Sequence, residues 1–266
     1  MNKIIMLGTG HGGTLDLYNT CFVIQNDKGN FLVDTGGGIE IIRRLKQINI
    51  DCEDIRHIFI SHSHTDHILG LFWLFKKISI RIIHGEINER IKIYCNDTVY
   101  QAIKEVSKHI LPDKAMNAIY SMVDFIILND GDTHNINGID YLFFDAHAKG
   151  TKLFGFQCEL NSKKLAFLGD ETANPDIYNK IRGYDYVMHE AFCLDSEENI
   201  FHPYEKNHST AKSVSEIMNS LEIKNLILYH TEDSHKEKRK ELYTAEAEKY
   251  FKGKVIVPDD LEIIEL

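Results

Sequence analysis

The chain of 266 residues has few prolines, few cysteines and no long apolar segment. Four prolines and a hydrophobic fraction of 43 % argue against disorder and provide apolar side chains for a large packed core. The five cysteines are widely scattered and form no Cys-x-x-Cys pair. That pattern favours buried free thiols in a reducing cytoplasm over disulfides or a cysteine-bound metal. No run approaches the ~18 consecutive apolar residues of a membrane span.

Basic side chains are in the minority, with 30 against 40 acidic ones and a formal charge of −10. A diffuse negative field repels polyanions, so an extended nucleic-acid-binding surface is not favoured, although a local basic patch in a cleft stays open. The first eight residues contain no cleavable apolar leader and predict a strand instead of a signal peptide. These features predict a cytoplasmic protein without a membrane segment. The length, without a linker or a break in composition, predicts a single domain over residues 1–266.

Hydrophobic periodicity predicts alternating strands and helices, as in an α/β protein. The predicted strands are 3–7, 21–25, 30–33, 58–60, 80–83, 92–94, 123–128, 139–145, 154–160, 165–168, 184–188, 226–229, 254–257 and 261–264. The predicted helices are 39–48, 68–77, 97–109, 115–123, 210–221 and 237–251. Asp97 or Thr98 is the expected cap of the third helix, and Ser209 that of the fifth.

The segment 58–67 carries three histidines and one aspartate directly after an apolar strand. Neutral imidazole and carboxylate are ligands that suit a borderline-soft divalent cation such as zinc. His62 and His64 can direct two rings at one metal, and Asp66 and His67 can serve a second metal beside it. We favour a metal site over a histidine-rich surface loop because later segments supply further ligands.

Other acid and imidazole groups also follow the ends of apolar strands. Asp170, His189 and His230 lie at such ends, and His147 lies two residues beyond one. Side chains at corresponding strand ends can converge on one edge of a sheet. Two metals that each keep a position for water need about six or seven ligands. Seven candidates are present: His62, His64, Asp66, His67, His147, Asp170 and His230. With two carboxylate oxygens, Asp170 is the natural bridge between the metals.

The His-x-His-x-Asp-His block at 62–67, followed in order by His147, Asp170 and His230, resembles the ligand pattern of the metallo-β-lactamase superfamily. The resemblance implies a four-layer αβ/βα sandwich with two mixed sheets and helices on both outer faces. It also implies a site for two divalent metal ions at one sheet edge. Zinc is the expected metal, although such ligands also accept manganese or iron.

The resemblance further implies how the ligands are shared. One metal would bind His62, His64 and His147, and the other would bind Asp66, His67 and His230. Asp170 and a water or hydroxide would bridge the two. Asp34 resembles the buried aspartate that braces the histidine loop in this superfamily, and a helix-capping role for Asp34 stays open.

Within the superfamily, the segments 188–192, 207–211, 228–231 and 258–261 resemble ribonuclease Z and its phosphodiesterase relatives. The aspartate at position 170 and the absence of a leader argue against a secreted β-lactamase, which carries cysteine there. A flavodiiron oxygen reductase is disfavoured because no flavin domain follows. The resemblance implies a phosphodiesterase that uses a metal-bridging hydroxide. Asp66 could accept a proton from that water, and His208, oriented by Glu190, could donate one to the leaving alkoxide.

Two departures argue against transfer-RNA maturation. The interval from His147 to Asp170 is too short for a long RNA-gripping arm, and the region near Ser234 lacks the Arg-Tyr pair that often follows the last ligand. Together with the excess of acidic over basic residues, these departures favour a small phosphodiester substrate over nucleic acid. The candidate substrate contacts are His11, Lys152, Tyr204 and Lys206.

Three alternatives stay open at this point. The same metals could hydrolyse a lactone, an ester or a thioester, with a tyrosine or a metal stabilising the oxyanion. The chain could also be a transfer-RNA 3′-processing endoribonuclease or a ligand sensor that has lost catalysis. A homodimer is expected only because the resembling family dimerises.

Overall fold

Within residues 2–172 and 175–266, which the computed structural model describes, two seven-stranded sheets face each other. The strands of the first sheet are β1 (Lys3–Gly8), β2 (Cys21–Asn26), β3 (Gly29–Val33), β4 (His57–Ile60), β5 (Ile91–Cys95), β6 (Val123–Ile127) and β14 (Ile263–Glu265). Those of the second are β7 (Thr133–Ile136), β8 (Ile139–Asp145), β9 (Phe154–Leu160), β10 (Lys163–Phe167), β11 (Tyr186–Glu190), β12 (Asn225–Tyr229) and β13 (Lys254–Ile256).

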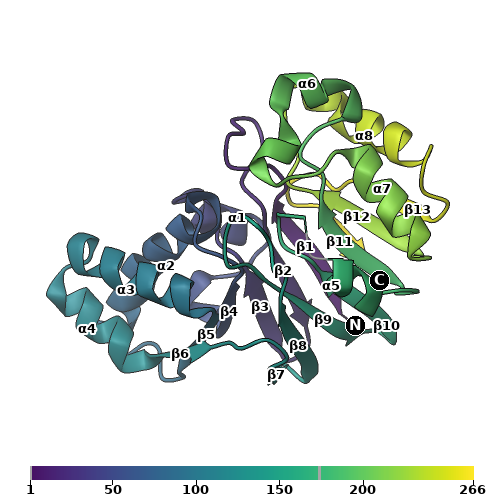
Figure 1. The fold of residues 1–266 in the computed structure, drawn as a ribbon. Helices are drawn as coiled ribbons and strands as arrows, with labels where there is room; N and C mark the ends of the chain where they lie inside the picture. Colours follow the sequence, from purple (N-terminus) through teal and green to yellow (C-terminus); the bar gives the residue numbers. More distant parts are fainter. Residues whose placement is uncertain (1, 173–174) are drawn as a thin grey trace.

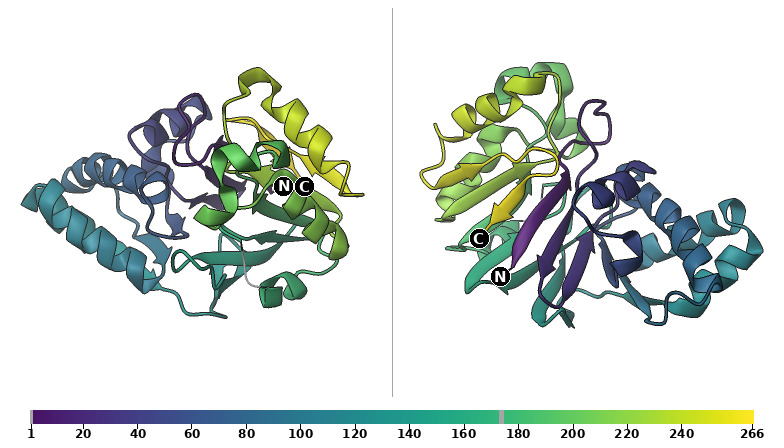
Figure 2. Two further views of the ribbon diagram at one scale, coloured as in Figure 1. Left: turned by 45° about the horizontal axis from the view of Figure 1, so that its top comes forward. Right: turned by 180° about the vertical axis from the view of Figure 1, so that it is seen from behind.

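The helices are α1 (Glu40–Gln47), α2 (Thr65–Ile83), α3 (Asp97–Ile110), α4 (Asp113–Met122), α5 (Pro175–Lys180), α6 (Glu198–Phe201), α7 (Ala211–Ser220) and α8 (Arg239–Ala247). Helices α1 to α4 cover the outer face of the first sheet, and α5, α7 and α8 cover that of the second (Figure 1). The predicted four-layer αβ/βα sandwich is therefore confirmed. The two chain ends lie close together, where β14 pairs with β1 (Figure 2). No helix in the described part of the chain is long and apolar enough to cross a membrane.

Three apolar layers hold these four layers together, because successive residues of a strand point to opposite faces of its sheet. In β4, Ile58 packs toward the helices, whereas Phe59 packs between the two sheets. The layer between the sheets is rich in aromatic rings, and the ring centroids of Phe59 and Phe156 lie 5.9 Å apart. In β12, Leu226 faces the helices of the second sheet. Strands that are buried on both faces explain the continuous apolar runs in the sequence.

The sheet orders place the ends of the central strands together. The first sheet runs β14-β1-β2-β3-β4-β5-β6 and the second runs β13-β12-β11-β10-β9-β8-β7. Strands β3 to β6 are parallel neighbours, as are β10 to β13. Their carboxyl ends therefore lie at one rim in each sheet. The Phe154 N–H of the second sheet donates to the Ser61 carbonyl after β4 at 3.0 Å, which joins the two rims.

Helix α2 differs from its prediction, because residues 80–83 continue the helix instead of forming a strand. The buried positions Leu71, Leu74 and Ile78 keep helical spacing, and no glycine or proline lies between Leu71 and Gly85. A short apolar run cannot be assigned to a strand by hydrophobicity alone. The unbroken helical spacing decides the structure here.

Two predicted helix caps are also wrong by one or two residues. The Asn96 side chain accepts from the Val99 N–H of α3, and the Thr210 side chain accepts from the Ser213 N–H of α7. Both residues have extended backbones, which direct their side-chain oxygens at the free N–H groups of the first turn. Strand β7 and helix α5 were not predicted, because both are short.

Arg239 at the start of α8 is almost completely buried and ties the last turn of the chain to the end of β12. Its guanidinium donates to Thr231 Oγ1 at 3.0 Å, to the Pro258 carbonyl at 2.6 Å and to Asp259 Oδ1 at 2.9 Å. We expect Arg239→Met to lower the free energy of unfolding by about 2 kcal/mol, because it leaves buried acceptors without their charged donor.

Urea unfolding measures this loss, with the exposed Lys238→Met variant as the matched control. The control is expected to unfold within about 0.5 kcal/mol of the wild type. Equal midpoints for the two variants would show that the buried guanidinium contributes nothing.

Candidate metal centre

Asp34 lies at the centre of the network that positions the histidines. It follows β3, is buried, and has a φ of 55°, a left-handed conformation that aspartate adopts more readily than most residues. Its Oδ1 accepts from the Ser61 N–H at 2.8 Å, and its Oδ2 accepts from Ser61 Oγ at 2.7 Å. His67 Nδ1 lies 2.8 Å from the same Oδ2. Asp34 therefore braces the loop after β4 and the first turn of α2, and it caps no helix.

This network decides which nitrogen of each ring faces the site. Because Asp34 accepts from Nδ1 of His67, the neutral form of that imidazole carries its proton on Nδ1 and offers Nε2 to a metal. His62 Nδ1 lies 3.0 Å from Ser61 Oγ, which leaves its Nε2 in the same state. Both Nε2 atoms face carboxylate oxygen. His67 Nε2 is 3.0 Å from Asp170 Oδ2, and His62 Nε2 is 3.5 Å from it.

Such an arrangement of acceptors fits a cation. In the described part of the chain, His62 Nε2, His67 Nε2 and Asp170 Oδ1 are buried and have no hydrogen-bond partner. A buried polar atom without a partner costs about 1–3 kcal/mol. A divalent metal between these atoms would satisfy them, because imidazole nitrogen and carboxylate oxygen are its usual ligands. The residues present therefore fit the metal that the sequence predicts.

The electrostatics of these groups also favour a bound cation. Burial lowers the pKa of His62 to about 3, so its ring is neutral, as a metal ligand must be. Burial opposes the charged form of His67 as well, but Asp170, Asp66 and Asp34 raise its pKa well above the ordinary value. Burial would raise the pKa of Asp170, yet His62, His67 and His230 hold it well below the ordinary range. The carboxylates thus create a field that attracts a cation.

Six of the seven predicted ligands come together in two overlapping groups. Among the described residues, single ligand atoms of each group all lie within 4.8 Å of one another. One group consists of Asp66, His67, Asp170 and His230, and the other of His62, His64 and Asp170. Asp170 belongs to both groups. This arrangement is consistent with a dinuclear site in which Asp170 is the shared ligand.

His147 is the predicted ligand that lies outside both groups. It sits in the loop after β8 with a φ of 50°, its N–H donates to Asp145 Oδ1 at 2.8 Å, and its side chain is 57 % exposed. The same loop is tied to the site at Gly150, whose N–H donates to Glu171 Oε2 at 3.0 Å. Glu171 directly follows Asp170. The ligand role of His147 stays a prediction.

His208 lies beside the metal ligands, but its ring has another partner than expected. Its Nδ1 is 2.6 Å from the Asp170 carbonyl, to which it donates, and 3.9 Å from Glu190 Oε2. The Phe192 ring stacks on it at 4.8 Å with an interplanar angle of 7°. Burial, followed by the nearby His230, lowers the pKa of His208 to about 4. Nε2 of His208 is therefore the atom left to face a substrate.

The glycine-rich loop after β1, residues 9–13, contacts the metal centre, which its sequence alone does not indicate. A Cβ atom on Gly12 would lie 3.0 Å from Asp66 Cγ, so any larger residue there would crowd the carboxylate. Next to it, His11 Nε2 lies 2.9 Å from Glu232 Oε1, and its Nδ1 accepts from the Gly13 N–H at 3.0 Å. Sequence reasoning missed Glu232, although it follows His230 by two residues and shares the strand-end signal.

The other candidate substrate contacts interact with side chains of the protein itself. Lys152 Nζ pairs with Asp97 at 2.7 Å, and Tyr204 Oη lies 3.4 Å from Thr210 Oγ1. Lys206 Nζ lies 4.9 Å above the Phe192 ring. Among them, Lys206 places a cation closest to the aromatic wall beside His208.

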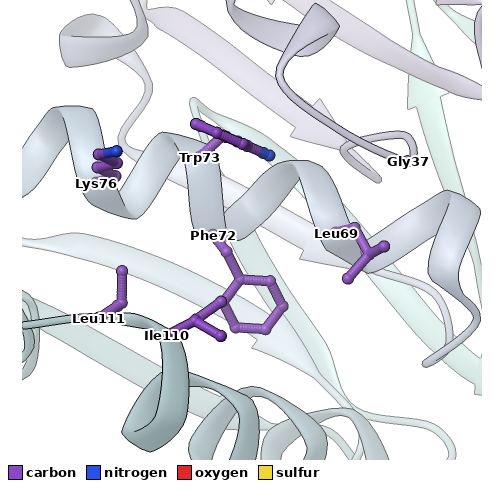
Figure 3. A pocket seen from close by; sticks show the side chains of 7 residues that line it. All are labelled: Gly37, Leu69, Phe72, Trp73, Lys76, Ile110 and Leu111. Carbon is purple, nitrogen blue, oxygen red and sulfur yellow. The ribbon is translucent and has the colours of Figure 1, made fainter.

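A separate pocket of about 250 Å³ lies along the outward face of α2. It is lined by Gly37, Leu69, Phe72, Trp73, Lys76, Ile110 and Leu111 (Figure 3). None of these side chains is an imidazole or a carboxylate. Because the pocket offers no metal ligand and no acid–base pair, we place the chemistry at the His/Asp groups instead.

Comparison with known proteins agrees with this geometry. A family model described as "Anti-Pycsar protein Apyc1" matches residues 2–251. A ribonuclease Z from Bacteroides thetaiotaomicron is 23 % identical over 272 residues, which cover 86 % of this chain and 84 % of the relative.

Two solved structures share the fold. The metallo-β-lactamase fold protein YhfI from Bacillus subtilis superposes with a TM-score of 0.81 at 14 % identity, over 99 % of this chain and 98 % of that one. A diphosphatase from the PhnP family superposes with a TM-score of 0.75 at 20 % identity, over 100 % and 98 % of the two chains. The predicted relationship to metallo-β-lactamase fold hydrolases of the ribonuclease Z group is thereby confirmed, and the chain belongs to the family of the anti-Pycsar protein Apyc1.

Proposed function

We propose that this metal-dependent hydrolase is a phosphodiesterase that opens a small cyclic nucleotide. The observation that carries the proposal is the pair of ligand groups that share Asp170, with buried Nε2 atoms directed at it. The similarity to ribonuclease Z favours a phosphoric diester as the substrate. Membership of the anti-Pycsar family favours a cyclic nucleotide as that diester.

The two ligand groups would hold two divalent cations, for which zinc is our first choice, with manganese or iron as alternatives. His62, His64 and Asp170 would hold one, with His147 completing the set. Asp66, His67, Asp170 and His230 would hold the other. Bound there, the cations would neutralise charge on the phosphoryl oxygens and lower the pKa of an attacking water.

His208 is placed to handle the proton of the leaving alkoxide. The Asp170 carbonyl holds its Nδ1, and Phe192 stacks on its ring, so only Nε2 can reach the substrate. The low pKa keeps Nε2 unprotonated in the free protein near neutral pH. A proton taken up from solvent on Nε2 in the substrate complex, beside the negative charge of the phosphodiester, is the one that the ring would donate to the leaving oxygen.

Asp66 is proposed to accept a hydrogen bond from the attacking water and so to orient it. Burial opposes the charged form of its carboxyl group, but His67 and His230 lower its pKa far below the ordinary value. The group is therefore ionised at neutral pH, which is the state that accepts a hydrogen bond from water. Gly12 packs against this carboxylate and limits its movement.

The proposal of a small substrate is supported by the segment between His147 and Asp170. Strands β9 and β10 of the second sheet occupy most of this interval, so it provides no extended arm for RNA. The net charge of −10 also disfavours a polyanion.

The first test is hydrolysis of cyclic nucleotide monophosphates and of bis(p-nitrophenyl) phosphate by the metal-loaded protein. Removal of the metal with a chelator should abolish turnover, and added zinc or manganese should restore it. We expect His64→Ala to lower kcat/KM at least about 100-fold, because it removes a ligand of one metal. His84→Ala, at the exposed end of α2, is the matched control.

The result that contradicts the proposal is a fully metallated protein that hydrolyses no diester, whether or not it cleaves lactones or thioesters. Efficient cleavage of a transfer-RNA precursor with a 3′ trailer would replace the proposed small substrate by RNA.

A further inference from the structure

At the metal centre, two buried polar atoms that do not face the other ligands have no hydrogen-bond partner within residues 2–172 and 175–266. They are Oε1 of Glu190 and Nδ1 of His230. Glu190 is the last residue of β11, and His230 directly follows β12. Because β11 and β12 are parallel with Glu190 opposite Tyr229, Glu190 and His230 are diagonal neighbours at the rim.

The two atoms are chemically complementary. His230 Nε2 faces the other ligands, at 3.3 Å from Asp170 Oδ2 and 3.5 Å from Asp66 Oδ2. A neutral histidine that binds a metal through Nε2 carries its proton on Nδ1, and that proton needs an acceptor. The free oxygen of Glu190 is such an acceptor. One ligand atom each of Glu190, His208 and His230 lies within 4.8 Å of the others, which places the Glu190 carboxylate beside the His230 ring. A small side-chain rotation or one water would join Oε1 to Nδ1.

The other oxygen of Glu190 and the ring of His208 have partners of their own, so neither occupies Oε1 of Glu190. Glu190 Oε2 accepts from the Phe192 N–H at 3.0 Å, and Ser209 also donates to this carboxylate. His208 already donates from Nδ1 to the Asp170 carbonyl at 2.6 Å, so it does not need Glu190 for its orientation. The oxygen that remains, Oε1, is the one that lacks a donor.

We infer that Glu190 is a positioning residue for His230. Its Oε1 accepts the Nδ1 proton of His230, directly or through one water, and thereby directs Nε2 at the metal that Asp66 and His67 share. This inference rests on the metal centre of the proposed function. It gives Glu190 a different task from the one the sequence suggests, which is the orientation of His208.

The test measures metal retention as well as activity. Zinc-loaded wild-type, Glu190→Ala, Glu190→Gln and His208→Ala proteins are titrated with a chromogenic chelator, and the bound metal is counted by elemental analysis. We expect Glu190→Ala to weaken one of the two metals about 10–100-fold, because an outer partner of a ligating histidine is lost. Glu190→Gln keeps an oxygen at the same place and should recover most of that affinity. His208→Ala should bind both metals as the wild type does while losing activity.

A second readout covers the case in which Glu190→Ala does not fold. In the zinc-loaded wild type, histidine NMR should show an exchange-protected Nδ1 proton of His230. Its resonance should shift in Glu190→Gln and not in His208→Ala. Full metal retention by Glu190→Ala, or a His230 proton that is insensitive to Glu190→Gln, overturns the inference. A wild type that binds two metals but cleaves no diester instead refutes the proposed function and leaves this inference standing.

Discussion

Asp170→Asn is expected to lower kcat/KM for phosphodiesters at least about 1,000-fold, the largest effect of any single substitution proposed here. Asp170 belongs to both ligand groups, and its Oδ2 lies 3.0 Å from His67 Nε2 and 3.3 Å from His230 Nε2. The amide keeps the shape of the side chain but removes the negative charge among the imidazoles. One amide oxygen cannot replace a carboxylate that bridges two cations.

The measurement combines steady-state kinetics with elemental analysis of the purified variant, which should hold fewer than two metals per chain. Asp124→Asn, at a half-buried carboxylate on β6 that pairs with Arg90 far from the metal ligands in sequence, is the matched control and should behave as the wild type. A variant at position 170 that holds two metals and retains its rate would show that the shared carboxylate is not a bridge.

Asp34→Ala is expected to have the second-largest effect, on stability and on metal affinity together. The substitution removes the acceptor of three hydrogen bonds, from the Ser61 N–H, Ser61 Oγ and His67 Nδ1. It also places alanine at a φ of 55°, which costs about 1–2 kcal/mol for a residue with a Cβ. We expect the free energy of unfolding of the metal-free protein to fall by about 3–4 kcal/mol. We expect metal affinity to fall about 10–100-fold, since His67 and His62 lose their orientation.

Urea unfolding in the presence of a chelator and metal competition measure the two losses separately. Asn is the informative comparison at this position, because it tolerates the left-handed backbone and keeps one acceptor oxygen. Asp34→Asn should therefore lose distinctly less stability than Asp34→Ala. Identical unfolding curves for the wild type and Asp34→Ala would show that this network does not hold the histidine loop.

Much of the metal centre was predictable from the sequence because its residues carry a local signal. Each ligand follows an apolar strand, and parallel strands end at one rim of a sheet. The role of Asp34 was inferred from the family resemblance, with helix capping as the alternative, and its three bonds become visible only in the folded chain. Glu232 shares the signal and could have been found, whereas Gly12 could not. The close approach of Gly12 to the Asp66 side chain joins two segments far apart in the sequence and leaves no mark on either segment alone.

Helix α2 shows where local pattern was insufficient. Its apolar end at residues 80–83 alone suits a strand as well as a helix, and the buried positions Leu71, Leu74 and Ile78 before it, which keep helical spacing, separate the two. The orientation of His208 is a similar case. Nothing in the segment 207–211 reveals that the Asp170 carbonyl, 38 positions away, is its hydrogen-bond partner.

The amino-acid sequence by itself determined the class of fold, the set of ligand types and their places at strand ends, because hydrophobic periodicity and residue chemistry are properties of the chain. The tertiary structure alone decided which nitrogen of each imidazole faces the carboxylates and which buried atoms lack partners. Those features depend on distances of a few ångströms between residues far apart in the sequence. Such distances arise only when the two sheets pack face to face and bring their rims together.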